Sequence, residues 1–149
     1  MIEIKNILFP CDLRETNSII LPYVISMAKK YDSTIHLLHV IVDVSKWGGL
    51  YIPHIPLDLY QKEAEQAAEK MMDKICTETL LGRSKFIKKV VSGDPAAEIL
   101  KTIRTENIDL VVMGTHGLNG LELRMVGNVT DKVIKESKAP VLVINPFRL

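Results

Sequence analysis

The sequence predicts an α/β fold, a doubly wound parallel sheet of five strands with helices on both faces. Short runs rich in β-branched residues and leucine alternate with segments of helical periodicity along the chain, and this alternation is typical of a parallel sheet covered by helices. Residues 108–113 (IDLVVM) are almost entirely apolar, as expected of a strand buried on both faces. A chain of 149 residues with 47% apolar side chains suits a substantial core, so we expect residues 1–149 to form a single domain.

Five runs are expected to form the strands, because each is short and rich in residues of high strand propensity. They are Ile4–Phe9, Thr34–Ile41, Phe86–Val91, Leu110–Met113 and Val141–Ile144. Right-handed crossovers between parallel strands leave few arrangements, and the doubly wound sheet is the commonest of these.

Helices are expected in the segments between these strands. After Asn17, apolar residues recur on one helical face, although Pro22 is tolerated only near a first turn or at a kink. That face comprises Ile19, Ile20, Tyr23, Val24, Met27 and Ala28. The apolar face of the next, longer helix comprises Ala64, Ala67, Ala68, Met71, Met72 and Ile75.

The last two helices have recognisable first residues. Asp94 is a favoured N-cap residue and Pro95 suits the first helical position, so the third helix is expected to begin there. Asn128 is again a favoured cap, and Asp131 follows three residues later in a spacing that resembles a capping box. The expected buried residues are Ile99, Leu100 and Ile103 in the third helix, and Val129, Val133 and Ile134 in the fourth.

The composition argues against several classes of protein. The formal net charge is +1, which gives no electrostatic basis for binding nucleic acid or a membrane surface. No apolar run approaches the length of a membrane span, and residues 1–10 lack the basic and long apolar regions of a signal peptide, so we expect a cytoplasmic protein. Cys11 and Cys76 are the only cysteines and neither lies in a CxxC motif, so we expect no metal site and no redox pair.

The segment Asp43–Pro56 (DVSKWGGLYIPHIP) does not fit the alternating pattern. It is long for a connection in a compact domain, and such segments are usually functional or disordered. Because it follows the second expected strand, it is expected to leave the carboxyl edge of the sheet. Its Trp47 either covers a ligand site or contacts a partner, and the sequence leaves both interpretations open.

The most informative strand end is at residues 113–117 (MGTHG). Ligands of open α/β sheets bind outside the carboxyl ends of the strands, where the strand order reverses. Gly114 and Gly117 bracket a tight turn here, and glycine lets the backbone approach a ligand closely. Gly127 and Asn128 open the last helix, and free N–H groups at a helix N-terminus attract anions. We therefore expect phosphates at this edge, although neither a Walker motif (GxxxxGK[ST]) nor a dinucleotide motif (GxGxxG) occurs.

Cys11 raises the alternative of a catalytic nucleophile, with His39 or His116 as its base. Nothing in the sequence brings these side chains together, and a cysteine at a strand end is more often a packed thiol. His36 and His39 are three residues apart on one strand, so they point to opposite faces and cannot form a metal-binding pair there. The sequence therefore indicates no catalytic residue.

At these residues the chain resembles the universal stress protein family, and specifically its ATP-binding branch. That branch carries the pattern G-x2-G-x9-G followed by a small hydroxyl residue, which Gly114, Gly117, Gly127 and Asn128 match except at the last position. Residues 7–13 (ILFPCDL), 37–41 (LLHVI) and 90–100 (VVSGDPAAEIL) resemble further segments of the family.

The resemblance implies a sheet of strand order 3-2-1-4-5, as in the adenine nucleotide alpha hydrolase-like folds, with the reversal between the first and fourth strands. It implies that base and ribose are bordered by Pro10, Cys11, Asp12, Val40 and Met113. It implies that the phosphates are held by Gly114, His116, Gly117, Gly127, Asn128 and Val129. Family members usually dimerise through the last strand, here Val141–Ile144.

Asn128 stands where the family pattern has a serine or threonine hydroxyl. The asparagine amide still donates hydrogen bonds, so we expect binding of ATP, ADP or AMP. The sequence leaves open whether Mg²⁺ binds together with the nucleotide. The expected function is that of an adenine-nucleotide-binding regulatory protein of the stress response, acting as a homodimer. Two alternatives remain: a dimeric interaction module that binds no nucleotide, and a slow ATPase that lacks the HxGH and SGGxDS signatures of enzymes with a similar fold.

Overall fold

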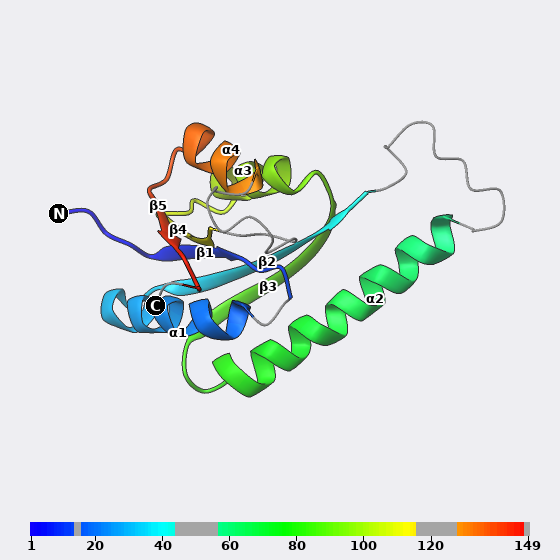
Figure 1. Ribbon diagram of the computed structural model, residues 1–149. Helices are drawn as coiled ribbons and strands as arrows, with labels where there is room; N and C mark the ends of the chain where they lie inside the picture. Colours follow the sequence, from blue (N-terminus) through cyan, green and yellow to red (C-terminus); the bar gives the residue numbers. More distant parts are fainter. Residues whose placement is uncertain (14–15, 44–56, 116–127, 148–149) are drawn as a thin grey trace.

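The computed structural model describes residues 1–13, 16–43, 57–115 and 128–147 (Figure 1). Strands and helices alternate along the chain as the sequence predicts. In order, the elements are β1 (Asn6–Pro10), α1 (Thr16–Tyr31), β2 (Thr34–Val42), α2 (Leu57–Ile75), the short π-helical segment η2 (Cys76–Leu80), β3 (Lys85–Gly93), α3 (Pro95–Thr105), β4 (Leu110–Gly114), α4 (Asn128–Glu136) and β5 (Val141–Ile144). The predicted strands are confirmed, with ends that differ by at most two residues.

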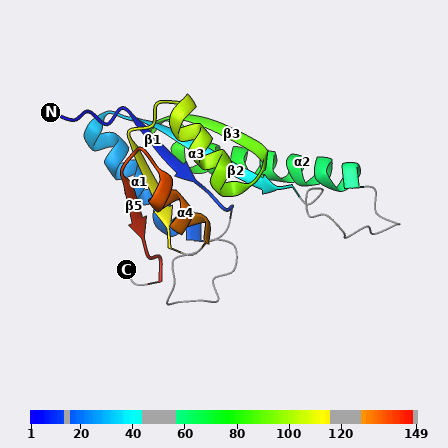
Figure 2. The same cartoon turned by 90° about the horizontal axis from the view of Figure 1, so that it is seen from above.

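The five strands form one parallel sheet in the order β3-β2-β1-β4-β5. Helices α1 and α2 cover one face, and α3 and α4 cover the other (Figures 1 and 2). The predicted doubly wound fold and strand order are therefore confirmed. The order reverses between β1 and β4, which are neighbours in the sheet although α1, β2, α2, β3 and α3 separate them in the sequence.

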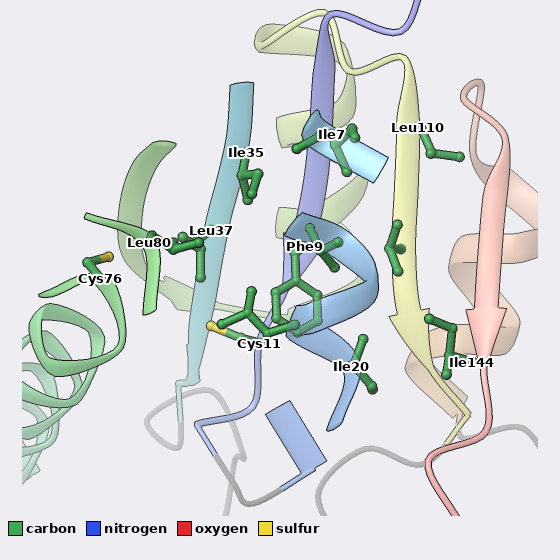
Figure 3. Close-up of a cluster of buried hydrophobic side chains, with 14 of the residues drawn as sticks. Ile7, Phe9, Cys11, Ile20, Ile35, Leu37, Cys76, Leu80, Leu110 and Ile144 are labelled. Atoms are coloured by element: carbon green, nitrogen blue, oxygen red, sulfur yellow. The ribbon is translucent and has the colours of Figure 1, made fainter. Parts of the chain in front are cut away.

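Side chains that alternate along the three central strands divide the core into two layers. In β1, Ile7 and Phe9 face the layer beneath α1 and α2 (Figure 3). Leu8 between them belongs to the layer beneath α3 and α4. In β4, Val112 belongs to the first layer and Val111 to the second. This alternation follows from the two-residue repeat of a strand, and it explains why these strands are apolar on both faces.

The predicted buried faces of the helices are only partly correct. Ile20, Val24 and Ala28 of α1 are buried, but Ile19 and Tyr23 are exposed and Leu21 is buried in their place. The buried face of α1 is therefore rotated about the helix axis, toward Leu21, relative to the predicted face. A helix resting on a flat sheet buries only a narrow stripe, and apolar residues on its flanks stay in solvent.

The same correction applies to α2 and α4. Met72 is fully buried, whereas its neighbour Met71 is 48% exposed, so the two do not form a buried pair. Ile134 of α4 is also exposed, and Thr130 is buried with Val133. Helical periodicity predicts a stripe about 100° wide, but the packing partner decides which of its edges is covered.

The start of α3 is formed as the sequence predicts. The carboxylate of Asp94 accepts a hydrogen bond of 2.9 Å from the backbone N–H of Ala97, and Pro95 occupies the first turn. Ile99, Leu100 and Ile103 are buried against the sheet. No helix in the described ranges is both long and apolar enough to cross a lipid bilayer.

The stability of the folded protein is expected to depend on pH, because His36 on β2 is buried. Its Nε2 lies 3.1 Å from Oδ1 of Asn6. Burial lowers the pKa of His36 below its usual value, and the charge of Glu106 opposes this shift only in part. The unfolded imidazole has a pKa of about 6.5, so as the pH falls the unfolded state takes up the proton first. The free energy of unfolding should therefore decrease below about pH 6.5 until the lower pKa of the folded state is reached.

Urea unfolding at about pH 7.5 and about pH 5.5 would measure this effect. In the variant His36→Gln, which cannot titrate, we expect a smaller loss of stability between the two pH values than in the parent. An equal loss in both proteins would contradict the role assigned to His36.

Candidate functional site

A cavity lies at the carboxyl ends of β1, β2 and β4, next to the point where the strand order reverses. Its volume is about 130 Å³, and the empty space reaches about 750 Å³ when the open mouth is included. A cavity of about 150 Å³ can hold benzene, so the inner part is of the size that a single planar ring occupies. The lining residues are Phe9, Pro10, Cys11, Asp12, Asn17, Ile20, Leu38, His39, Val40, Pro95, Ile99, Met113, Gly114, Val129 and Thr130.

Seven of the eleven residues predicted to contact a nucleotide line this cavity. They are Pro10, Cys11, Asp12, Val40, Met113, Gly114 and Val129. Asn128 begins α4 as expected, but its side chain is exposed and it is not one of the lining residues. His116, Gly117 and Gly127 lie outside the described residues. The strand ends predicted to converge therefore do so, while the roles assigned to the individual residues stay predictions.

Cys11 is a packed thiol at the wall of the cavity. Its Sγ lies 3.9 Å from Sδ of Met72 in the buried core. Burial, with a smaller contribution from the charge of Asp12, raises the pKa of the thiol to about 12. The thiolate, which is the nucleophilic form, is therefore not populated near neutral pH. The packing of Cys11 therefore gives no support to the alternative of a catalytic cysteine.

His39 is held by the backbone rather than by the thiol. Its Nδ1 lies 2.7 Å from the carbonyl oxygen of Cys11. Because a carbonyl oxygen only accepts hydrogen bonds, Nδ1 carries the proton and donates it to that oxygen. His36 contacts Asn6 instead, so the two histidines are separated as the sequence predicts.

The chain turns sharply directly after Asp12. Leu13 has a φ of 63°, in the left-handed region that residues other than glycine rarely adopt. This backbone conformation ends the segment that follows β1 and leaves Asp12 in the cavity wall. Asp12 therefore lies at the edge of the sheet where ligands bind in this class of fold.

The end of β4 and the first turn of α4 are joined by a hydrogen bond. The hydroxyl of Thr130, which is buried, donates to the carbonyl oxygen of Gly114 over 3.1 Å. The backbone N–H of Thr115 also donates to the carbonyl of Ile144, over 2.9 Å. The first bond holds the beginning of α4 at the end of β4, and Val129 and Thr130 of this first turn line the cavity.

Several lining residues are missing from the sequence prediction. Asn17, Ile20 and Thr130 come from the first turns of α1 and α4, and Pro95 and Ile99 come from α3. Strand ends and the start of the last helix are where the sequence indicates a ligand, and its pattern marks the other helix positions as caps or core. A useful signal was available for Thr130, because it lies two residues after the predicted helix start and presents a hydroxyl there.

The arrangement combines an apolar interior with a few polar groups. Val40, Met113 and Ile99 contribute apolar walls, while Asp12 and Thr130 contribute polar side chains. Apolar pockets with a few well-placed polar groups are typical of small-molecule sites. Within the described part of the chain, no group of three histidine, cysteine or acidic side chains is arranged to hold a metal ion.

Known proteins of similar sequence and structure form one family. The sequence model of the universal stress protein family matches residues 3–145. The chain is 32% identical over 143 residues to universal stress protein MJ0531 of Methanocaldococcus jannaschii, covering 94% of this chain and 81% of that protein. It is 31% identical over 153 positions to universal stress protein MJ0577 of the same organism, covering 94% of each.

The similarity extends to solved structures. The structure of MJ0577 superposes with a TM-score of 0.77 at 33% identity, covering 97% of both chains. A universal stress protein solved in complex with cAMP shares the fold, with a TM-score of 0.62 at 15% identity, covering 97% of this chain and 99% of that one. Because the family match spans nearly the whole chain and two relatives exceed 30% identity, this chain belongs to the universal stress protein family.

Proposed function

We propose that this chain is a regulatory protein that binds an adenine nucleotide in the cavity at the carboxyl ends of β1, β2 and β4. The observation that carries the proposal is the convergence there of residues from three strand ends and the first turn of α4. This edge is where doubly wound folds bind their ligands. The inner volume of about 130 Å³ suits one ring of the fused purine base, and the open mouth leaves room for the rest of a nucleotide.

In this arrangement the base lies between the apolar side chains of Val40 and Met113. The carboxylate of Asp12 accepts hydrogen bonds from ribose hydroxyls or from the exocyclic amine. The phosphates lie along the backbone from Gly114 to Asn128 and at the N-terminus of α4, where N–H groups and the helix dipole favour negative charge. Mg²⁺ accompanies the ligand only if a triphosphate is bound.

The comparison with solved structures supports the ligand class. One universal stress protein of the same fold was solved in complex with cAMP, which is itself an adenine nucleotide. For this chain we propose ATP, ADP or AMP as the ligand, because the glycine spacing resembles that of the ATP-binding branch. We propose the cytoplasm as the place where it is bound.

Mass spectrometry of small molecules released by denaturing the purified protein tests the proposal directly. We expect an adenine nucleotide in the released fraction, and calorimetric titration of emptied protein should then rank ATP, ADP, AMP and cAMP. If no nucleotide is released and none binds at millimolar concentration, the proposed function is wrong.

The glycine motif between Gly114 and Gly127 leads to a prediction about substitutions of its glycines. We expect Gly117→Val and Gly127→Val each to weaken nucleotide binding by about a hundredfold or more, because a branched side chain blocks close approach of the backbone to a phosphate. Gly120→Val is the matched control, since Gly120 lies in the same segment but outside the motif. Calorimetry on the three variants checks this. Equal affinity in Gly117→Val and the parent would contradict the phosphate assignment.

We further propose that the protein forms a homodimer through β5. Among the described strands it lies at the edge of the sheet and pairs with β4 alone, and Leu142 on it is exposed. Sedimentation analysis should give a dimer. A dimer that binds no nucleotide would support the alternative of a nucleotide-independent interaction module. Turnover of ATP at a rate on the order of 10 per second, as in ordinary enzymes, would support an enzyme instead.

A further inference from the structure

Asn17 lines the cavity and has a buried side-chain amide nitrogen that no described protein group satisfies. The residue lies in the first turn of α1 and is 6% exposed. It lines the same cavity as Asp12 and Val40. Its Nδ2 atom is buried and has no hydrogen-bond partner in the described part of the protein.

An unpartnered amide at this position is unfavourable for the protein alone. A buried donor without an acceptor bears the full penalty of its lost hydration, and most buried polar side-chain atoms in proteins have a partner. The first turn of α1 contains no acidic side chain that could serve as an acceptor. The amide and the N-terminus of α1 therefore both favour an electron-rich atom at this side of the cavity.

We propose that Nδ2 of Asn17 donates a hydrogen bond to an acceptor atom of the bound nucleotide, which makes Asn17 a specificity-determining residue of the site. This inference rests on the proposed function, because it needs a ligand in the cavity. The required chemistry is an acceptor, either a phosphate oxygen or an atom of the nucleoside. Ligands that bring no acceptor to this position leave the amide unpaired and are discriminated against.

The variant Asn17→Leu separates a ligand-binding role from a structural one, because leucine has a similar branched shape but no donor. We expect the affinity for AMP to decrease about tenfold, the typical effect of losing one hydrogen bond of this kind. Without nucleotide, the melting temperature should be unchanged or higher by about 2–4 °C, since the variant buries no unpaired amide. Asn17→Ala removes the donor without filling the space and should show the same loss of affinity.

Ser84→Ala is the matched control. The hydroxyl of Ser84 is also buried without a partner in the described residues, but Ser84 is not one of the residues that line the cavity. Its replacement should leave the affinity for AMP unchanged, so any loss of affinity in the Asn17 variants is specific to the cavity.

Titration with adenosine as well as AMP identifies the acceptor. A loss of affinity for both ligands places the acceptor on the nucleoside, and a loss confined to AMP places it on the phosphate; either result supports the proposal. Parental affinity for both ligands in both Asn17 variants would overturn it. So would a lower melting temperature of both variants without nucleotide, since the amide would then stabilise the fold itself. If the parent binds neither ligand, the proposed function fails first, and the role of Asn17 fails with it.

Discussion

Leu37→Ala is expected to lower the free energy of unfolding by about 3 kcal/mol, within the range of 2–5 kcal/mol observed when a buried leucine is replaced by alanine. Leu37 lies in the middle of β2 and is 1% exposed. It belongs to the core layer beneath α1 and α2, together with Phe9 and Leu80 (Figure 3). The packed β-strands around it cannot close the space that the shorter side chain leaves, so the transfer free energy and the cavity both contribute.

Urea unfolding measures this change, and the melting temperature should fall by roughly 10 °C for a chain of this size. Leu59→Ala is the control, because it is the same substitution at a position on α2 that is 53% exposed. We expect that change to alter stability by less than about 0.5 kcal/mol. Similar losses in the two variants would contradict the assignment of Leu37 to a tightly packed layer.

Val40→Phe is expected to abolish nucleotide binding, with a loss of affinity of about a hundredfold or more, while the protein remains folded. Val40 lines the cavity from β2 and is partly buried against the layer beneath α3 and α4. The inner cavity of about 130 Å³ has room for the added aromatic ring, since a space of about 150 Å³ can hold benzene. The ring would then occupy the position that we assign to the base.

Calorimetric titration with AMP and a melting curve of each variant would check this prediction together. Val91→Phe is the control: Val91 is opposite Val40 in the strand register and packs against the same layer, but it is not one of the lining residues. Its binding should resemble that of the parent. If Val40→Phe binds AMP as tightly as the parent, the base does not lie in this cavity.

The strands could be predicted because they depend on local patterns, whereas their order was implied by the resemblance to the universal stress protein family. The central strands are largely apolar on both faces, and in β4 this gives an unbroken apolar run over residues 110–113. The helix boundaries with strong local signals were also found, above all Asp94 and Pro95 at the start of α3. In each case the residues that determine the structure lie next to one another in the sequence.

The buried faces of the helices were predicted less well. Ile19 and Leu21 are equally apolar, but only Leu21 is buried. Which of them contacts the sheet depends on the rotation of α1 about its axis, and residues of β1 and β4 set that rotation. The same reason applies to Met71 of α2 and Ile134 of α4. Each is exposed because the rotation of its helix turns it away from the surface on which the helix packs.

Local sequence patterns were enough to predict the alternation of strands and helices, the core strands and the strand ends at which a ligand site was expected, because hydrophobic periodicity, caps and glycine turns act over a few residues. The folded structure was needed to show that Asn17, His39 and Thr130 also line the cavity, and that Cys11 is a thiol packed against Met72. A side chain becomes buried, or is left without a hydrogen-bond partner, when segments far apart in the chain pack against it. Only folding brings such groups together and removes their water.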